Sequence, residues 1–276
     1  MKFFKKIHNK VLNKTTNNIF MNRDYRKLDV NYDNFFSITS PSINLEKPLI
    51  KQIQRVSFEL SNICNYSMIH KKCPASRVKE KKVLSAGIVE KVITELSSIN
   101  YEGLFVFHRY NEPFIDPRLF GFIKTANKLC PNSKILLLTN GFYLTQQLAN
   151  ELTELNIWIL AVSAYSDAEF ERLSALTVNF PYTVFKSILD GRENIYDGEI
   201  LDHKKNCFAP LRDLTINAQG EVVLCCLDWE NRHVFGKLDK NSLDDIVKEK
   251  KFQQLALDLS TGKRNLDICR RCSMVR

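Results

Sequence analysis

The chain has 276 residues, of which 44% are hydrophobic, and it carries a formal net charge of +9. This length suits one large domain or two smaller ones, and the chain holds no apolar run long enough to predict a transmembrane helix. Lysines and arginines are spread along the whole chain and form no basic stripe interleaved with aromatic residues, so we expect solvated basic faces and no nucleic-acid surface. Eight cysteines without a secretory signal favour metal ligands and buried thiols over disulfides, and a cytoplasmic location.

The predicted elements alternate after an irregular start. Residues 1–50 are rich in asparagine and lysine and form a predicted N-terminal extension. Strands are predicted at 56–60, 104–108, 135–139 and 157–163, and helices near 85–98, 117–129 and 144–155. Repeated βα units over residues 51–205 predict a parallel sheet, either doubly wound or an open barrel. Ligands in such folds bind at the carboxyl ends of the strands.

Four cysteines fall at metal-ligand spacings in residues 206–276, namely Cys207, Cys225, Cys269 and Cys272. Residues 212–226 alternate around a turn at Gly220 and predict a hairpin that brings Cys207 and Cys225 together. A predicted helix through residues 243–255 then returns the chain to the C-R-R-C segment. Four thiolates at one point make a metal site, so this region is predicted to be a small α+β metal-binding domain.

A polar sequence follows each predicted strand: F-E-L-S-N-I-C-N-Y-S-M-I-H-K-K-C-P, then Y-N-E-P, T-N-G and V-S-A-Y-S. This order strongly resembles the radical S-adenosyl-L-methionine (SAM) superfamily. The resemblance implies a partial (βα)6 barrel, with a [4Fe-4S] cluster held by cysteines of the first-strand loop. It assigns the amino group of SAM to Asn111, Glu112 and Pro113, with Asn140 and Ser163 lining the same end of the barrel.

The C-terminal cysteines resemble the auxiliary-cluster domain of the SPASM/twitch subgroup, which has a cysteine, then G-x4-C, then further cysteines near the C-terminus. Cys207 and Gly220 are separated by twelve residues, and C-C-L-D from Cys225 repeats the ending of the subgroup pattern. The resemblance implies an auxiliary [4Fe-4S] cluster on the four C-terminal cysteines. A structural zinc site is the alternative, but hairpin-separated ligands match the auxiliary-cluster pattern better than paired zinc knuckles.

The first-strand loop departs from the usual C-x3-C-x2-C pattern. It contains Cys64 and Cys73, and counting from Cys64 puts Met68 and Lys71 at the two other positions. We interpret the loop as C-x5-H-x2-C, with His70 replacing the middle thiolate; a surface histidine is an equal alternative. Because imidazole is neutral, such a cluster has a higher reduction potential than one with three thiolates. Met68 is expected to be an apolar plug over the cluster.

The resemblance implies an oxidoreductase or modifying enzyme whose auxiliary cluster accepts an electron or holds substrate. The substrate is a small molecule (a carbohydrate or cyclitol) or a peptide, and an external electron donor such as flavodoxin or ferredoxin is the expected partner. The alternative is a degenerate member that acts as an iron-sulfur scaffold or electron-transfer partner without radical initiation. The intact N-E-P and T-N-G segments favour the enzyme, and the missing cysteine favours the scaffold.

Four residues beside these motifs have an expected structural or substrate-lining role. His108 is expected to be a hydrogen-bonded core histidine, and Asp228 a turn carboxylate in preference to a proton acceptor for substrate. Arg109 and Tyr110 are candidates for the lining of a substrate cavity, although packing explains Tyr110 equally well.

Overall fold

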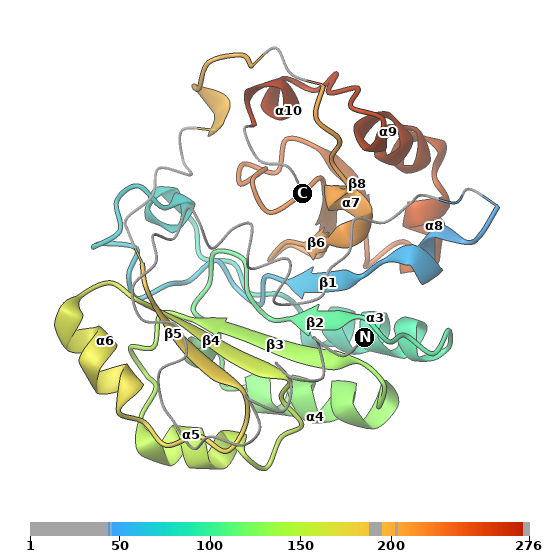
Figure 1. Ribbon diagram of the computed structural model, residues 1–276. Coiled ribbons are helices and arrows are strands. Elements are labelled where there is room, and N and C mark those ends of the chain that lie inside the picture. Colours follow the sequence, from blue (N-terminus) through green and yellow to red (C-terminus); the bar gives the residue numbers. More distant parts are fainter. Residues whose placement is uncertain (1–43, 45, 188–194, 202–203, 273–276) are drawn as a thin grey trace, which may run out of the picture.

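The computed structural model describes residue 44 and residues 46–187, 195–201 and 204–272. Most of the predicted N-terminal extension, residues 1–50, lies outside these ranges. Within them, one eight-stranded sheet has the order β5-β4-β3-β2-β1-β6-β7-β8 (Figure 1). The strands are β1 (Arg55–Phe58), β2 (Leu104–Val106), β3 (Lys134–Thr139), β4 (Ile159–Ala164), β5 (Tyr182–Lys186), β6 (Leu214–Ile216), β7 (Glu221–Val223) and β8 (Val234–Lys237). Strands β1 to β5 pair in parallel, so the predicted α/β fold is confirmed.

One helical turn precedes β1, and further helices connect the parallel strands (Figure 1). They are η1 (Leu49–Gln52), η2 (Pro74–Arg77), α3 (Ala86–Ser97), η3 (Pro113–Ile115), α4 (Leu119–Leu129), α5 (Gln146–Leu152) and α6 (Asp167–Ser174). The C-terminal region adds α7 (Ala209–Arg212), α8 (Leu243–Lys248), α9 (Lys250–Ser260) and α10 (Asp267–Arg271). None of the helices in the described ranges has the length and apolar character needed to cross a membrane.

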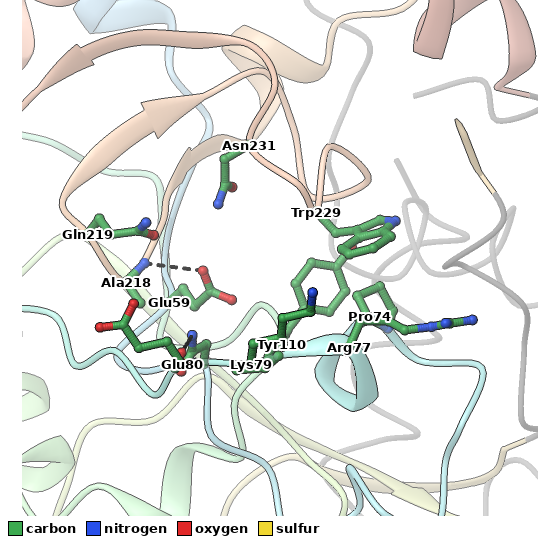
Figure 2. Close-up of a pocket in the computed structure, with 12 residues that line it drawn as sticks. Glu59, Pro74, Arg77, Lys79, Glu80, Tyr110, Ala218, Gln219, Trp229 and Asn231 are labelled. Atoms are coloured by element: carbon green, nitrogen blue, oxygen red, sulfur yellow. Dashed lines mark hydrogen bonds between the residues drawn. The ribbon is translucent and has the colours of Figure 1, made fainter. Parts of the chain in front are cut away.

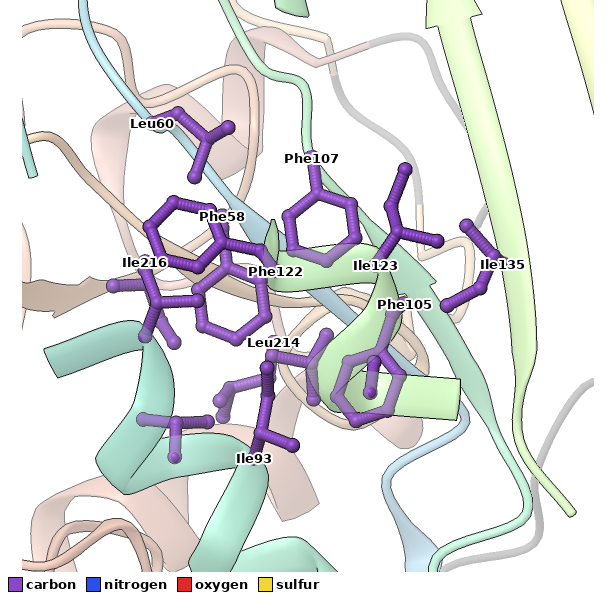
Figure 3. Close-up of a cluster of buried hydrophobic side chains, with 14 of the residues drawn as sticks. Phe58, Leu60, Ile93, Phe105, Phe107, Phe122, Ile123, Ile135, Leu214 and Ile216 are labelled. Atoms are coloured by element: carbon purple, nitrogen blue, oxygen red, sulfur yellow. The ribbon is translucent and has the colours of Figure 1, made fainter. Parts of the chain in front are cut away.

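The main core lies between the sheet and α3 and α4 (Figure 3). Phe58 of β1 stacks on Phe105 and Phe107, with ring centroids 6.2 and 5.6 Å apart. Helix α3 buries Val89, Val92, Ile93 and Leu96, which lie on one face at helical spacing. This spacing predicted a helix at 85–98, and the structure confirms it within a residue at each end.

The C-terminal hairpin continues the barrel sheet. Strand β6 pairs in parallel with β1, placing Leu214 beside Val56, and then pairs antiparallel with β7. The turn between β6 and β7 needs Gly220, because its φ is +75° and a Cβ there would lie 2.5 Å from Cδ1 of Ile88. The predicted hairpin is thus confirmed, and β6 joins the predicted 51–205 and 206–276 regions through one sheet.

The single helix predicted over residues 243–255 is wrong. The chain forms α8 and α9 with a break at Glu249, whose backbone is extended at φ −57° and ψ 132°. A continuous helix would place Lys250 and Lys251 below Val247 on the buried face. The break rotates α9 so that both lysines are exposed and Phe252 is buried.

Candidate functional site

Glu112 is a buried carboxylate beyond the end of β2, with 1% of its surface exposed. Oε1 accepts hydrogen bonds from Thr139 Oγ1 at 2.6 Å and from the backbone N–H of Phe114 at 3.2 Å. Oε2 accepts from the backbone N–H of Asn140 at 2.9 Å. Burial raises the pKa of Glu112 to about 7, because desolvation outweighs these three bonds and no cation among the described residues offsets it. The site therefore holds a carboxylate without a positively charged partner.

Asn111 and Asn140 fix the surroundings of Glu112. The side chain of Asn111 donates to the carbonyl of Phe107 and accepts from the backbone N–H of Arg109, so it shapes the loop after β2. The side-chain amide nitrogen Nδ2 of Asn140 lies 3.8 Å from Sγ of Cys64. The structure therefore brings together three of the predicted SAM- and cluster-binding residues: Cys64, Glu112 and Asn140. Pro113 begins η3, and Ser163 lies on β4 without a described side-chain contact to this group.

The first-strand loop buries its histidine and exposes its methionine. His70 is 6% exposed and Met68 is 80% exposed, so the surface-histidine alternative and the apolar-plug expectation are both wrong. The ring of His70 meets Tyr165 edge-on with centroids 5.6 Å apart, and its Nδ1 is buried without a hydrogen-bond partner. Burial, and then the charges of Glu112 and Cys73, raise the pKa of the Cys64 thiol to about 12. These groups therefore share one local environment.

The four C-terminal cysteines also share one environment. Cys207, Cys225 and Cys269 pack in one cluster with apolar side chains that include Leu224 and Leu259. Burial, and then the charges of Cys207 and Cys272, raise the pKa of the Cys269 thiol to about 12. A set of four thiols is the usual ligand set of a [4Fe-4S] cluster.

Neither cysteine group forms a compact site for a single ion, because no three His, Cys, Asp or Glu side chains in the described ranges are close enough to hold one. A four-iron cluster takes each ligand on a different iron, so its ligands are spaced more widely than the ligands of one ion. The ligand chemistry of the C-terminal group fits such a cluster. The first-strand group offers two thiols and the imidazole of His70, whose Nδ1 has no hydrogen-bond partner among the described residues.

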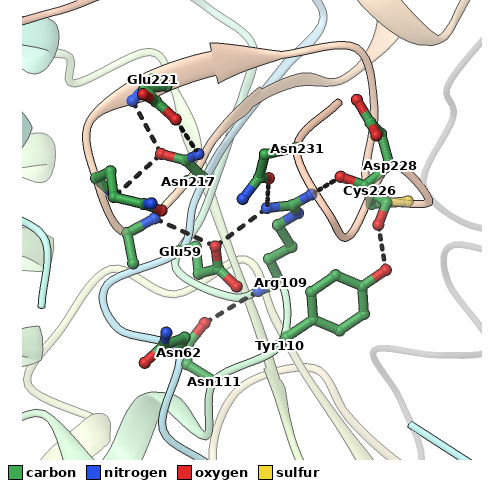
Figure 4. A network of polar contacts seen from close by, with 12 residues as sticks. Glu59, Asn62, Arg109, Tyr110, Asn111, Asn217, Glu221, Cys226, Asp228 and Asn231 are labelled. Atoms are coloured by element: carbon green, nitrogen blue, oxygen red, sulfur yellow. Dashed lines mark hydrogen bonds and ion pairs between the residues drawn. The ribbon is translucent and has the colours of Figure 1, made fainter. Parts of the chain in front are cut away.

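A buried polar network ties the barrel to the C-terminal region (Figure 4). Nη1 of Arg109 lies 3.1 Å from Oε2 of Glu59 and 2.8 Å from Oδ1 of Asn231, and Nη2 donates to the carbonyl of Asp228 at 2.7 Å. Tyr110 donates its hydroxyl proton to the carbonyl of Cys226. The loop after β2 therefore holds the loop after Cys225 in place. Sequence reasoning missed Glu59 and Asn231, although the position of Glu59 at the end of β1 is a usable signal.

Asp228 has a structural role in the same loop. It is fully buried and accepts hydrogen bonds from the Tyr196 hydroxyl at 2.5 Å and from the backbone N–H groups of Arg232 and His233 at 3.0 and 2.9 Å. This arrangement supports the turn-carboxylate interpretation. His108 likewise has a local partner, since its Nδ1 lies 2.8 Å from the carbonyl oxygen of Asn111.

A cavity of about 180 Å³ lies between the barrel loops and the C-terminal region (Figure 2). Its lining mixes charged and aromatic side chains, among them Glu59, Arg77, Lys79, Glu80, Tyr110 and Trp229. Tyr110 lines this cavity, whereas Arg109 is not part of the lining and contacts Glu59 in the buried network. The indole Nε1 of Trp229 is buried without a hydrogen-bond partner. The cavity offers polar and flat apolar surfaces to a small ligand.

Known proteins resemble the chain in sequence and in fold. The family model of the SPASM iron-sulfur cluster-binding domain matches residues 207–273. The S-adenosyl-L-methionine-dependent 2-deoxy-scyllo-inosamine dehydrogenase of Niallia circulans is 25% identical over 238 residues, covering 82% of this chain and 94% of that protein. The crystal structure of BtrN in complex with AdoMet and 2-DOIA aligns with a TM-score of 0.69 at 24% identity, covering 81% of this chain and 94% of BtrN. Native anSMEcpe with bound AdoMet and the Cp18Cys peptide aligns with a TM-score of 0.53 at 11% identity, covering 79% of this chain and 85% of that one.

The two solved structures support the fold, and the SPASM match identifies the C-terminal cysteine group as an iron-sulfur cluster-binding domain in preference to a zinc site. The dehydrogenase shares sequence with the barrel as well as with this domain, because the alignment covers 82% of the chain. The chain therefore contains a region similar to the SPASM iron-sulfur cluster-binding domain, and over most of its length it is similar in sequence to an S-adenosyl-L-methionine-dependent dehydrogenase.

Proposed function

We propose that the protein is a radical SAM oxidoreductase that dehydrogenates an alcohol group of a cyclitol or carbohydrate. Glu112 carries this proposal, because it is buried beside Cys64 and Asn140 with three hydrogen-bond donors and no cation. The ammonium group of SAM supplies the missing positive charge. When bound, SAM and a first-strand [4Fe-4S] cluster supply hydrogen-atom abstraction from an unactivated C–H bond.

Oxidation of a CH–OH group to a ketone removes one hydrogen atom, one electron and one proton. We assign uptake of the hydrogen atom to SAM cleavage, the electron to the auxiliary [4Fe-4S] site on Cys207, Cys225, Cys269 and Cys272, and the proton to solvent or a cavity base. The proposed substrate position is the cavity between the two regions. Its lining by Tyr110 and Trp229 suits the C–H face of a ring, and Glu59 and Glu80 offer acceptors for hydroxyl or amino groups.

The size of the cavity favours a small molecule over a peptide. About 180 Å³ suits a single ring with its substituents. The dehydrogenase of Niallia circulans acts, by its name, on 2-deoxy-scyllo-inosamine, a cyclitol, and its alignment covers most of both chains. These two observations support a cyclitol or carbohydrate ahead of a peptide substrate.

SAM cleavage needs an electron from outside the protein, and we propose an acidic donor such as flavodoxin or ferredoxin. Lys71 and Lys72 are exposed beside Met68 and Ile69 on the first-strand loop. This basic and apolar surface suits a negatively charged partner. It lies on the loop that carries Cys64 and Cys73, where the electron is required.

A scaffold without radical initiation is the second candidate function. One observation favours it: the first-strand loop has two thiols where the family pattern has three. Anaerobic reconstitution, followed by reduction in the presence of SAM and of cyclitols differing in amino and hydroxyl groups, separates the two candidates. The oxidoreductase forms 5′-deoxyadenosine in amounts that match the ketone product. If the protein carries both clusters and binds SAM but forms no 5′-deoxyadenosine, the scaffold function stands instead.

A further inference from the structure

We infer that His70 is the third protein ligand of the first-strand cluster, beside Cys64 and Cys73. This inference rests on the proposed function, which requires a cluster at this loop. It assigns an imidazole to a position where the family pattern has a thiolate. The backbone turns of the loop and the burial of its side chains support this assignment.

Backbone hydrogen bonds fold the loop into consecutive turns. The N–H of His70 donates to the carbonyl of Tyr66 at 2.7 Å, and the N–H of Cys73 donates to the carbonyl of His70 at 3.0 Å. His70 and Cys73 therefore stand at the two ends of one turn, which brings their Cα atoms close together. The turn keeps the two-residue gap of the usual motif, and the longer segment from Cys64 to His70 contains the extra residues.

Burial in the loop is opposite to what hydrophobicity predicts. Met68 and Ile69 are 80% and 61% exposed, and Lys71 and Lys72 are also exposed, whereas the polar ring of His70 is only 6% exposed. A buried imidazole normally has hydrogen-bond partners for its ring nitrogens, but Nδ1 of His70 has none within the part of the chain that the structure describes. A cluster iron is a partner that satisfies such a nitrogen.

The ring also lies at the correct end of the barrel. Tyr165, which contacts the His70 ring edge-on, follows β4 at its carboxyl end. Cys64 in the same loop contacts Asn140 and is close enough to Glu112 and Cys73 to interact with them electrostatically. By contrast, the residues at the regular motif positions, Met68 and Lys71, are both exposed, and a charged lysine has no lone pair to offer.

The test uses the full chain, reconstituted anaerobically without SAM, in four forms. These are the wild type, His70→Ala, His70→Cys and the exposed-neighbour control Lys72→Ala. Iron and acid-labile sulfide are counted, and circular dichroism checks that each variant is folded. Pulsed electron paramagnetic resonance of the reduced protein, labelled with ¹⁵N-histidine, detects an imidazole bound to the cluster.

Wild type and Lys72→Ala should hold about eight irons and show the ¹⁵N coupling, because two four-iron clusters are present. His70→Ala should lose roughly half of the iron and all of the coupling. His70→Cys should keep the iron and lose the coupling. Adding Met68→Cys to His70→Ala should not restore the iron, since residue 68 points to solvent.

Two results overturn the inference, and they are distinguishable. If His70→Ala keeps the full iron content and an unchanged spectrum, His70 is not a ligand, while the proposed function survives. If the wild type itself holds only about four irons, and Cys269→Ala removes all of them, the first-strand cluster does not form and the proposed function fails together with the inference.

Discussion

Replacing Glu112 by glutamine should weaken SAM binding and leave the fold intact. In the wild type the carboxylate is 1% exposed and accepts three hydrogen bonds, but it faces no cation among the described residues. The rise of its pKa from 4.5 to about 7 corresponds to about 3 kcal/mol by which burial, after the opposing hydrogen bonds, disfavours the ionised form. An ammonium group in contact recovers part of this free energy.

The expected loss in Glu112→Gln follows from two contributions. The amide removes the charge that attracts the ammonium, and its nitrogen cannot accept the hydrogen bond that Asn140 N–H now donates to Oε2. A hydrogen bond to a charged group contributes about 1.5–3 kcal/mol, which is roughly a 10- to 150-fold increase in Kd. Isothermal titration calorimetry of the anaerobically reconstituted protein measures this change directly.

Glu90→Gln is the matched control, because Glu90 is exposed on α3. It should bind SAM with the affinity of the wild type, and both variants should match the wild type in iron content. If Glu112→Gln binds SAM as tightly as the wild type, the carboxylate does not hold the ammonium, and the assignment of Asn111 to Pro113 to SAM is wrong.

Four further predictions concern stability, the clusters and the electron donor. Because the folded pKa of Glu112 lies above its unfolded value, the protein without SAM should lose stability as the pH rises from about 4.5 through about 7; urea unfolding should show this loss in the wild type and not in Glu112→Gln. Arg109→Ala leaves the buried Glu59 carboxylate without its cationic partner, so it should lower the free energy of unfolding by about 3–5 kcal/mol, whereas Arg77→Ala at an exposed cavity position should have little effect. Cys269→Ala should remove roughly half of the iron and lower the melting temperature of the reconstituted protein, and an unchanged iron content would contradict the auxiliary site. Charge reversal at Lys71 and Lys72 should slow reduction by flavodoxin without slowing reduction by dithionite, and equal slowing of both would count against a docking surface.

Local periodicity predicted much of the fold. Val89, Val92, Ile93 and Leu96 repeat at helical spacing, and α3 ends within a residue of the prediction at each end. The helix over 243–255 failed because Ile246 and Val247 on one side and Phe252 on the other cannot share one helical face. The sequence contains two separate helical patterns there. The charged residues between them, which are as common inside a helix as at its end, give no sign of the break at Glu249.

The sequence motifs predicted which residues of the candidate site lie close together, but not the contacts outside the motifs. Cys64, Glu112 and Asn140 come from three loops, and their order along the chain was enough to place them together. The contact of Arg109 with Glu59 and Asn231 joins residues 50 and 122 positions apart, and no pattern in one sequence shows such pairs. The burial of His70 was equally hidden, since its neighbours Lys71 and Lys72 indicate an exposed loop.

The parallel pairing of β1 with β6 has a consequence for electron movement. The loop with Cys64 extends from β1, and Cys225 follows β7, so both cysteine groups are joined to one sheet through strands that are separated by β6 alone (Figure 1). Tunnelling rates fall steeply with distance, and the β1–β6 ladder ties the strand that leads to Cys64 to the hairpin that leads to Cys225. For the proposed transfer of an electron from substrate to the auxiliary site, we expect this ladder to keep the transfer rate similar for substrates that occupy the same position.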